Sequence, residues 1–511
     1  MIRKINIGAL ILTLLFASCE SWLDVNDNPN YPDDTGYEVV LPSGITSVVY
    51  VMGGRYQVLG SLWSEHWTQS LGASQYAGID SYDINSSSFD DNQFGELYTG
   101  ALKAFEYVRK GSAAEEQWNY YLIATVMQSY TFQVLADLYD QIPFSEALAG
   151  DMNNLTPRYE RGQDIYDSLI VRIDKALAKD LDRDDLKDPG KNDVIFGGVM
   201  ARWVEFANTL KLKLYLRQSE VRPDIARTGI EELYAGNADF LSADAAFDHF
   251  EDQSGQRNPL YETDINVFGG NPNLVLSRTL HSYLLENDDY SRLNLMFYTP
   301  QAGGAHKSLV QGNYNDPDEP AGTNSSSYSK PILLPREKVY LMSYSEACFL
   351  QAEAIIRYNT ESYSVAREKY NAGLSAAYTR LLVLSDLTQE EKDNLIQSFV
   401  NGRYRFTTEG SPLEEFLERI IVQKWVSLAG VQSLETFFEH NRTHYPKVSD
   451  FLPDNDLYEP GSFTVSVNNV TSGRFPKRLL FPESEVTSNP NTPPQMPVWT
   501  KVWWDVKPEE N

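Results

Sequence analysis

The residues best suited to bond-breaking chemistry are few and scattered along the chain. His440 and His444 have the i, i+4 spacing of two zinc ligands on one helix face, but Pro446 follows closely and no third ligand is nearby. The sequence contains no His-Glu-x-x-His helix, no Gly-x-Ser-x-Gly elbow and no phosphate-binding glycine loop. Among its 71 acidic residues no pair stands out as the two carboxylates of a glycosidase. We therefore expect no metal centre and no enzyme, with a surface glycoside hydrolase as the remote alternative.

One acidic segment could hold a cation. Residues 313–319 (NYNDPDE) offer hard oxygen ligands of the kind that calcium binds. The segment lacks the glycine and the closing glutamate of an EF-hand loop. We expect no cofactor, and a structural calcium ion at this segment is the alternative that the sequence leaves open.

Aromatic residues interleaved with amides and carboxylates form the more informative pattern. A sugar ring has an apolar face that an aromatic plane can cover, and hydroxyl groups that amides and carboxylates can bind. Three segments supply this mixture and together predict a glycan-binding site. The candidates are Tyr76, Tyr82, Asp83 and Asn85 in the first, Tyr261, Asn266 and Phe268 in the second, and Tyr298, His306 and Tyr314 in the third. For each residue alone, packing of its loop against the rest of the fold is the alternative.

Tryptophans near the C-terminus form a further aromatic group. Trp499, Trp503 and Trp504 could make a second binding platform, or they could tie down the C-terminal tail. Trp63 and Trp67 stand four residues apart, so they would share one helix face and are expected in the core.

The binding loops need a frame, and a period of 3.6 residues predicts one made of helices. The predicted helices cover residues 44–70, 94–110, 115–139, 161–179, 196–218, 224–235, 274–286, 343–357, 363–378, 390–400, 413–429 and 432–440. Loop-rich insertions near residues 72–92, 240–273 and 298–339 separate them, and loops of this length in a compact protein are usually functional. The C-terminal tail, residues 462–511, begins with the strand-like alternation of Phe463, Val465 and Val467.

Small residues at fixed spacing suggest how the helices pair. Ala354, Ala366, Tyr370 and Gly373 match the small and aromatic positions of a tetratricopeptide repeat, in which Ala and Gly let two helices approach. A generic helix hairpin is the alternative. We predict a mainly α-helical fold, with a tetratricopeptide-like frame of helix pairs, long irregular loop insertions and a few short strands.

The N-terminus has the pattern of a lipoprotein signal peptide. In residues 1–18, Arg3 and Lys4 precede an apolar run of eleven residues, which is too short to span a bilayer. Small residues then stand directly before Cys19, so we predict cleavage at this point and lipidation of the cysteine thiol. An ordinary signal peptide with a chance cysteine is the alternative.

Charge and cysteine content limit the partners of the mature chain. The formal net charge of the full sequence, −28, argues against nucleic acid and against docking on anionic lipid headgroups. The lipid on Cys19 would then be the membrane anchor. We expect residues 19–36 to be a polar tether and residues 37–511 to form a single domain. Cys348, in an apolar stretch, is expected to be inert core packing without a disulfide.

Four segments, in order along the chain, match the motifs of one known family. They are residues 19–30 (CESWLDVNDNPN), residues 135–147 (LADLYDQIPFSEA), the late helix pair with Gln423, Lys424, Trp425, Glu435 and residues 442–446 (RTHYP), and residues 478–482 (RLLFP) followed by Glu485 and residues 489–491 (NPN). With these segments the chain resembles the SusD/RagB nutrient-binding lipoproteins of the bacterial outer membrane. Gln141, Phe144, His444 and Leu480 depart from the family's usual residues.

The resemblance implies a role in nutrient uptake and polysaccharide utilisation. Proteins of this kind bind glycans or other nutrients at the cell surface and act as a lid on a SusC-like TonB-dependent transporter. Together with the loop residues, it predicts a non-catalytic, lipid-anchored, surface-exposed protein that binds glycan. Oligopeptide cargo, as in RagB-like proteins, and a scaffold that binds only another protein are the alternatives. The matching segments assign no ligand contacts, and we expect Glu435, Arg442 and Arg478 to form buried ion pairs.

Overall fold

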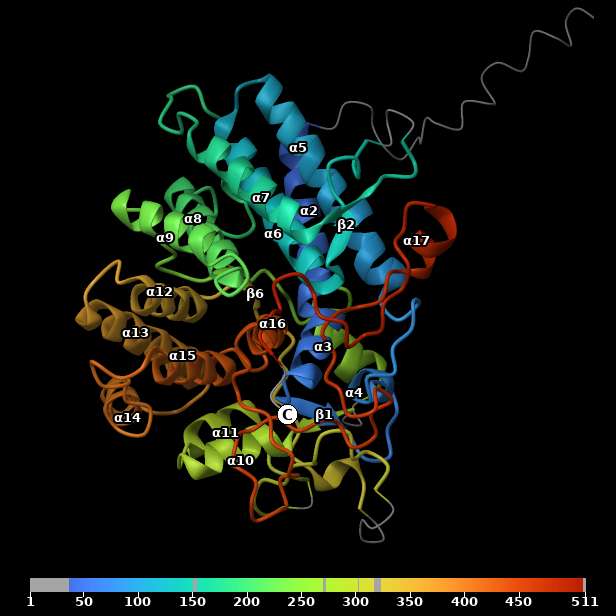
Figure 1. Ribbon diagram of the computed structural model, residues 1–511, viewed down its shortest axis with the longest axis vertical. Coiled ribbons are helices and arrows are strands. Elements are labelled where there is room, and N and C mark those ends of the chain that lie inside the picture. The colour runs from blue at the N-terminus through green and yellow to red at the C-terminus, as the bar shows by residue number, and fades with distance from the viewer. Residues whose placement is uncertain (1–35, 150–153, 270–272, 302, 317–322, 509–511) are drawn as a thin grey trace, which may run out of the picture.

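The computed structural model describes residues 36–149, 154–269, 273–301, 303–316 and 323–508 (Figure 1). The signal peptide, Cys19 and almost all of the tether lie outside these residues, as does part of the acidic segment 313–319. The structure is mainly α-helical, as the sequence predicts. Its strands form three short antiparallel pairs: β1 (Trp67–Gln69) with β5 (Leu274–Leu276), β2 (Gln141–Pro143) with β3 (Tyr159–Arg161), and β4 (Ala245–Phe247) with β6 (Val339–Met342). Among the helices described here, none is both long and apolar enough to cross a lipid bilayer.

A row of helix pairs forms the frame. Its helices are α5 (Lys103–Ala114), α6 (Trp118–Tyr139), α7 (Gly162–Leu177), α8 (Met200–Arg217), α9 (Pro223–Ala235), α12 (Tyr344–Tyr358), α13 (Tyr363–Leu382), α14 (Gln389–Asn401), α15 (Leu413–Ser427) and α16 (Ser433–Thr443). Helix α6 packs against α5, α7 and α8. Helix α8 packs against α9 and α12, and α12 packs against α13 and α15. In Figure 1 this row descends from α5 at the top, through α8 and α9, to α13 and α15 at the left.

The contact between α12 and α13 explains the small residues of the predicted repeat. A Cβ atom on Gly373 would lie 3.1 Å from the carbonyl oxygen of Ser345 and 3.2 Å from the Cβ atom of Cys348, so only glycine allows this approach without a shift. The other residues of the pattern, Ala354, Ala366 and Tyr370, are fully buried. The predicted helix pairing is therefore confirmed here, and Cys348 lies in the core as expected.

The first long helix is interrupted, although the sequence predicts a single helix over residues 44–70. Helix α2 (Tyr37–Gly53) ends before Gly54, and α3 (Arg55–Trp63) begins directly after it. Gly54 has φ −106° and ψ −112°, and a Cβ atom there would lie 2.7 Å from the carbonyl oxygen of Tyr50. Both Trp63 and Trp67 are buried, as predicted, but they do not share a helix face, because Trp67 lies on strand β1 after α3 has ended. Helical periodicity does not reveal this break, because the apolar pattern continues across it.

Further differences lie at element ends. The helix predicted over residues 274–286 begins as β5, and α10 (Arg278–Glu286) starts only after Ser277, whose Oγ accepts a hydrogen bond from the backbone N–H of Thr279 (3.3 Å). π-Helical turns precede α5 at Asp90–Gly95 and Leu97–Leu102. The alternation after residue 462 forms no strand, because Phe463 finds only a single bridge, to Val448. The sequence does not predict three short α-helices, α4 (Ala77–Asp80), α11 (Tyr290–Met296) and α17 (Glu483–Ser488), or the π-helix Tyr261–Val267 within the insertion 240–273.

A cluster of buried charges joins the middle of the frame, and we call it the buried ion network. It comprises Asp137, Lys213, Arg217, Glu346, Glu353, Lys424, Glu435, Glu439 and Arg442. Arg217 binds Glu435 at 2.5 Å and Glu439 at 2.6 Å, which connects α8 to α16. The expected buried ion pairs are confirmed: Glu435 pairs with Arg217, and Arg442 pairs with Glu353. Arg478 is also buried, 3.6 Å from Asp140.

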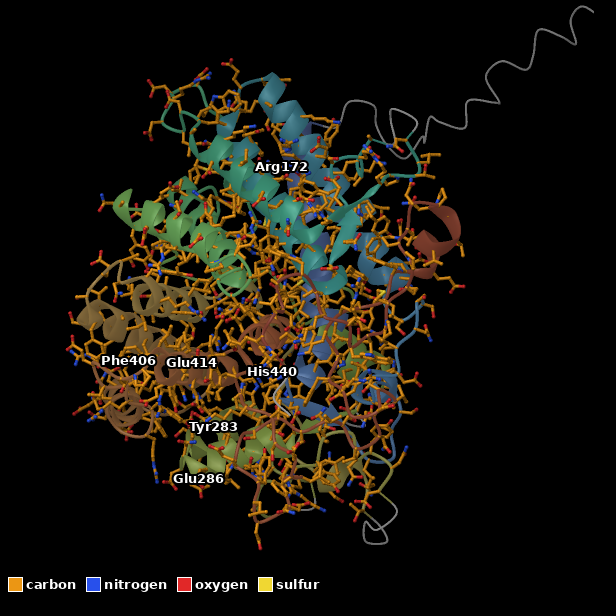
Figure 2. All side chains as sticks on the ribbon, in the orientation of Figure 1. Arg172, Tyr283, Glu286, Phe406, Glu414 and His440 are labelled. Atoms are coloured by element: carbon orange, nitrogen blue, oxygen red, sulfur yellow. The ribbon has the colours of Figure 1, made fainter. Side chains whose placement is uncertain are left out.

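His440 is buried and lies near the middle of the view in Figure 2. Its ring stacks on Phe463 with 4.4 Å between the centroids. Burial lowers the pKa of His440 well below its usual value, and nearby Lys477 acts in the same direction. His444 takes a left-handed conformation that ends α16. The i, i+4 spacing of these two histidines thus serves packing and the end of a helix.

Candidate ligand-binding site

Two hollows in the described surface are bordered by the loop insertions. The first, which we call the large cleft, has a volume of about 820 Å³ and takes residues from the insertions 240–273 and 298–339. The second, which we call the Arg55 pocket, has a volume of about 120 Å³ and lies where the insertions 72–92 and 240–273 meet the break between α2 and α3.

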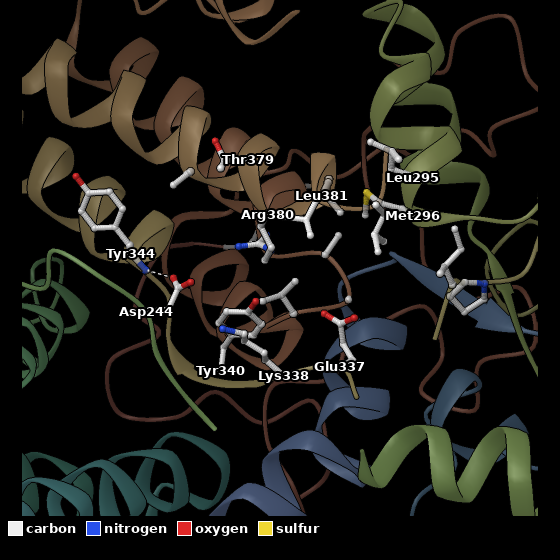
Figure 3. Close-up of a pocket in the computed structure, with 18 of the residues that line it drawn as sticks. Asp244, Leu295, Met296, Glu337, Lys338, Tyr340, Tyr344, Thr379, Arg380 and Leu381 are labelled. Atoms are coloured by element: carbon white, nitrogen blue, oxygen red, sulfur yellow. Dashed lines mark hydrogen bonds between the residues drawn. The ribbon is translucent and has the colours of Figure 1, made fainter. Parts of the chain in front are cut away.

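The large cleft is mostly aliphatic. Its apolar lining includes Leu295, Met296, Ile332, Leu333, Leu381, Val383 and Val431. Figure 3 shows Arg380 and Leu381 on α13 facing the segment that carries Glu337 and Tyr340. Arg380 donates a hydrogen bond to the carbonyl oxygen of Ser427 (2.6 Å). Burial raises the pKa of the Glu337 carboxyl, which Arg380 and Lys338 offset only in part.

The Arg55 pocket has a different lining. Its residues are Tyr50, Gly54, Arg55, Val58, Tyr76, Asn92, Gln93, Pro259, Leu260 and Thr263. The break at Gly54 places Tyr50, from the end of α2, and Arg55, from the start of α3, at the same small cavity. None of these lining residues carries a carboxylate, so the pocket itself offers no pair of acids for general acid–base catalysis.

Arg55 is the unusual group in this pocket. Its guanidinium carbon stands 5.5 Å from the centroid of the Phe89 ring and 6.0 Å from that of Tyr76, in cation–π contact with both. Burial lowers the pKa of Arg55. No hydrogen bond or ion pair joins its side chain to any part of the chain that the structure describes. Its N–H donors therefore remain available to a ligand.

The neighbouring side chains suit a polar ring. The Tyr50 side chain is 52% exposed at the edge of the pocket, where its flat face can cover an apolar surface. The amides of Asn92 and Gln93 and the hydroxyl of Thr263 supply both donors and acceptors. Stacking, amides and a guanidinium together can bind a sugar.

Sequence comparison identifies the family. A model of the SusD-like proteins, described as starch-binding and associating with the outer membrane, matches residues 43–464. The chain belongs to the SusD-like family. The resemblance drawn from its sequence motifs is confirmed. A comparison with curated proteins gives no match.

Solved structures with the SusD-like fold superpose on nearly the whole chain. A chitin-binding protein is 22% identical, with a TM-score of 0.72 over 91% of this chain and 100% of that one. A SusD/RagB family protein from Bacteroides thetaiotaomicron is 24% identical, with a TM-score of 0.70 and coverage of 93% and 100%. A chitin-binding SusD homologue from Flavobacterium johnsoniae is 20% identical, with a TM-score of 0.69 and coverage of 92% and 99%. At these identities the likeness shows a common tetratricopeptide-like helical fold.

Three of the ten site residues predicted for this SusD-like protein are buried, so their rings cannot stack on a ligand at the surface. Tyr76, 2% exposed, forms a wall of the Arg55 pocket, and burial, together with Asp264, raises the pKa of its phenol. The Tyr82 hydroxyl accepts a hydrogen bond from the backbone N–H of Ser466 (3.2 Å). Tyr314 is 9% exposed. Each of these three tyrosines packs its loop against the rest of the fold. A ligand-binding role for them stays a prediction, and Tyr76 is the one that lines a pocket.

The other seven predicted residues keep some exposure, and none of them lines either hollow. Asp83, Asn85, Asn266, Phe268 and Tyr298 are exposed, whereas Tyr261 and His306 are half-buried. His306 already bonds through both ring nitrogens, to Ser329 Oγ and to Asn294 Oδ1, each at 2.9 Å. Lys330 stands over the ring of Tyr298, with Nζ 5.6 Å from the ring centroid. A ligand-binding role for these seven residues stays a prediction.

The C-terminal tryptophans hold the tail in place. Trp504 is fully buried and donates from Nε1 to an oxygen of Asp137 (2.8 Å). Trp503 packs its edge against Tyr166, with 5.0 Å between the ring centroids. Arg474 covers Trp499 at 4.0 Å. These tryptophans therefore tie down the C-terminal tail and do not form a second aromatic platform.

Proposed function

We propose that this SusD-like protein binds glycan at the Arg55 pocket and, anchored to the outer membrane through a lipid on Cys19, passes it as a lid to a SusC-like TonB-dependent transporter. The binding site is supported by one observation, the meeting of the exposed Tyr50 ring, the unpaired Arg55 guanidinium and two side-chain amides. The family description, starch-binding, and the names of two structural neighbours, chitin-binding, support the class of ligand.

Recognition would come from contact alone. The apolar face of a sugar ring covers Tyr50, while its hydroxyl groups bind Arg55 and the amides of Asn92 and Gln93. The cavity of about 120 Å³ encloses only a small part of a polysaccharide, so the rest of the ligand lies over the exposed rim. Each polar contact replaces a contact with water, which keeps the net affinity modest.

Replacing Tyr50 by alanine should weaken glycan binding about tenfold, since a stacked aromatic ring contributes about 1–2 kcal/mol. Isothermal titration with oligosaccharides of glucose and of N-acetylglucosamine measures the effect. Tyr290→Ala is the matched control, because Tyr290 lies on α11 with a similar exposure of 54%. Tyr298→Ala tests the loop that the sequence predicts. Equal affinities for Tyr50→Ala and Tyr290→Ala would place the glycan elsewhere.

The lipid anchor is tested by metabolic labelling. Cells that express the full chain and are fed radiolabelled palmitate should attach label to the wild-type protein, and Cys19→Ala should remove it completely, because Cys19 is the predicted acceptor thiol. Cys348→Ala should leave the label unchanged, since Cys348 is fully buried. Label that persists in Cys19→Ala would refute the anchor.

Oligopeptide is the second candidate ligand, and the large cleft favours it. The volume of this cleft falls in the range of ligand pockets, and its aliphatic walls suit apolar side chains. Glu337 makes no ion pair with any described residue, so its carboxylate could bind a peptide amine. Mass spectrometry of ligand carried through purification decides between the two classes, and a recovered peptide would favour this cleft.

A further inference from the structure

The charge around Arg55 differs from that around the three fully buried arginines. The chain has 71 acidic and 43 basic residues, so a cation usually finds an acidic partner. Arg217, Arg292 and Arg442 are fully buried, and each lies within 4 Å of a carboxylate. Arg55 is largely enclosed, yet it has no acidic partner among the described residues. A positive charge that the fold leaves uncompensated in a pocket is a binding group for an anion.

The enclosure of Arg55 strengthens the attraction between its guanidinium and an anion, because fewer water molecules screen it. The rings of Tyr76 and Phe89 both lie within 6.0 Å of the guanidinium. The pocket lining contains no carboxylate that would repel an anion. The protein's net charge of −28 acts from a distance, and at physiological salt charges beyond about 8 Å are largely screened. Arg55 is the only charged side chain among the residues that line the pocket, and the nearby carboxyl of Asp264 lies behind Tyr76.

We propose that the Arg55 pocket selects acidic saccharides and that Arg55 pairs with the carboxylate of a uronate residue. This inference rests on the proposed glycan-binding function and names the class of glycan. The planar guanidinium matches the two oxygens of a carboxylate in a bidentate pair. Tyr50 covers the uronate ring, and the amides of Asn92 and Gln93 bind its hydroxyl groups.

The preference for a charged ligand should be measurable. A hydrogen bond to a charged group contributes more than one between neutral groups, and the difference corresponds to about a tenfold change in affinity for one pair. A methyl ester of the same uronate keeps the shape of the ligand and removes its charge. The acid and its ester therefore form a matched pair of ligands.

Isothermal titration at pH 7 with tetrasaccharides of galacturonate and of mannuronate, each against its methyl ester, tests the proposal. The wild-type protein should bind at least one acid about tenfold more tightly than its ester. Arg55→Gln should lose this preference, through weaker binding of the acid and little change for the ester. Arg55→Lys, which keeps the charge and loses the planar fork, should fall between the two. It also replaces Arg55→Gln if that variant does not fold.

Arg172→Gln is the control variant. Arg172 is also largely enclosed and lies 4.2 Å from the centroid of an aromatic ring, that of Phe144, in the upper part of Figure 2. Its substitution should leave the preference for acid unchanged.

The outcomes separate this inference from the proposed function. If the wild type binds the esters or neutral oligosaccharides as tightly as the acids, the acidic class is wrong while glycan binding holds. If no saccharide binds at all, both proposals fail. If Arg55→Gln keeps the preference for acid, the anion is bound elsewhere and the assignment to Arg55 is wrong.

Discussion

Replacing Arg442 by methionine is expected to lower the free energy of unfolding by about 3–5 kcal/mol. The guanidinium of Arg442 donates to both carboxylate oxygens of Glu353 at 2.8 Å and to Glu439 at 2.5 Å, and all three side chains are buried. Burial alone would raise the pKa of Glu353, but Arg442 and then Arg357 hold that pKa below its usual value. Methionine leaves two acidic groups in the core without their main partner. Urea denaturation followed by circular dichroism measures the change.

Arg161→Met is the matched control for this experiment. Arg161 also binds a carboxylate, that of Asp164 at 2.8 Å, but both side chains are exposed at the start of α7. An exposed pair contributes about 0–1 kcal/mol, so this variant should unfold close to the wild type. Similar losses in the two variants would contradict the view that the buried ion network stabilises the frame.

The buried ion network also shows how far motifs can predict a structure. The family motifs mark Glu435, Arg442 and Arg478 as structural residues. All three are buried with partners. Their partners could not be predicted, because Arg217 and Glu353 lie far away in the sequence and meet α16 only once the helix row has formed.

The candidate site was harder to predict than the frame. Periodicity treats residues 44–70 as one helix, so Tyr50 and Arg55 look like ordinary helical positions. Only the Gly53-Gly54 pair marks the break that places them at one pocket. The sequence also does not show whether an aromatic ring in a loop points inward or outward. Tyr82 points inward and contacts Ser466 in the tail, a residue 384 positions away. What the sequence did provide is the position of the insertions, two of which border the Arg55 pocket.

Glu65 should make the protein less stable as the pH rises, and Glu65→Gln should remove this effect. Its carboxyl group is fully buried at the end of α3, which raises its pKa from 4.5 to about 8. Hydrogen bonds from the Thr279 hydroxyl and the Thr464 backbone N–H offset this in part, and Asp80 adds to it. Between these two pKa values the unfolded chain has lost the proton and the folded chain retains it. Stability is therefore full below pH 4.5 and falls as the pH rises toward 8, by about 1.4 kcal/mol per pH unit.

The difference in unfolding free energy between the wild type and Glu65→Gln reports on the Glu65 carboxyl group, because the other titrating groups are the same in both proteins. At pH 5 the wild type and Glu65→Gln should unfold with similar free energies, because the amide can accept from Thr464 N–H and donate to the Thr279 hydroxyl. At pH 8 the variant should be the more stable by roughly 4 kcal/mol. Asp80→Asn is the control. Burial raises the pKa of Asp80 only to about 6, so the stability that this variant gains over the wild type should stop increasing near pH 7. Urea titrations from pH 5 to 8 measure all three proteins, and curves for the wild type and Glu65→Gln that stay parallel would show that Glu65 ionises normally in the folded protein. Because Glu65 joins α3 to the start of α10 and to the C-terminal tail, a gain in stability at pH 8 should come with slower proteolysis of the tail.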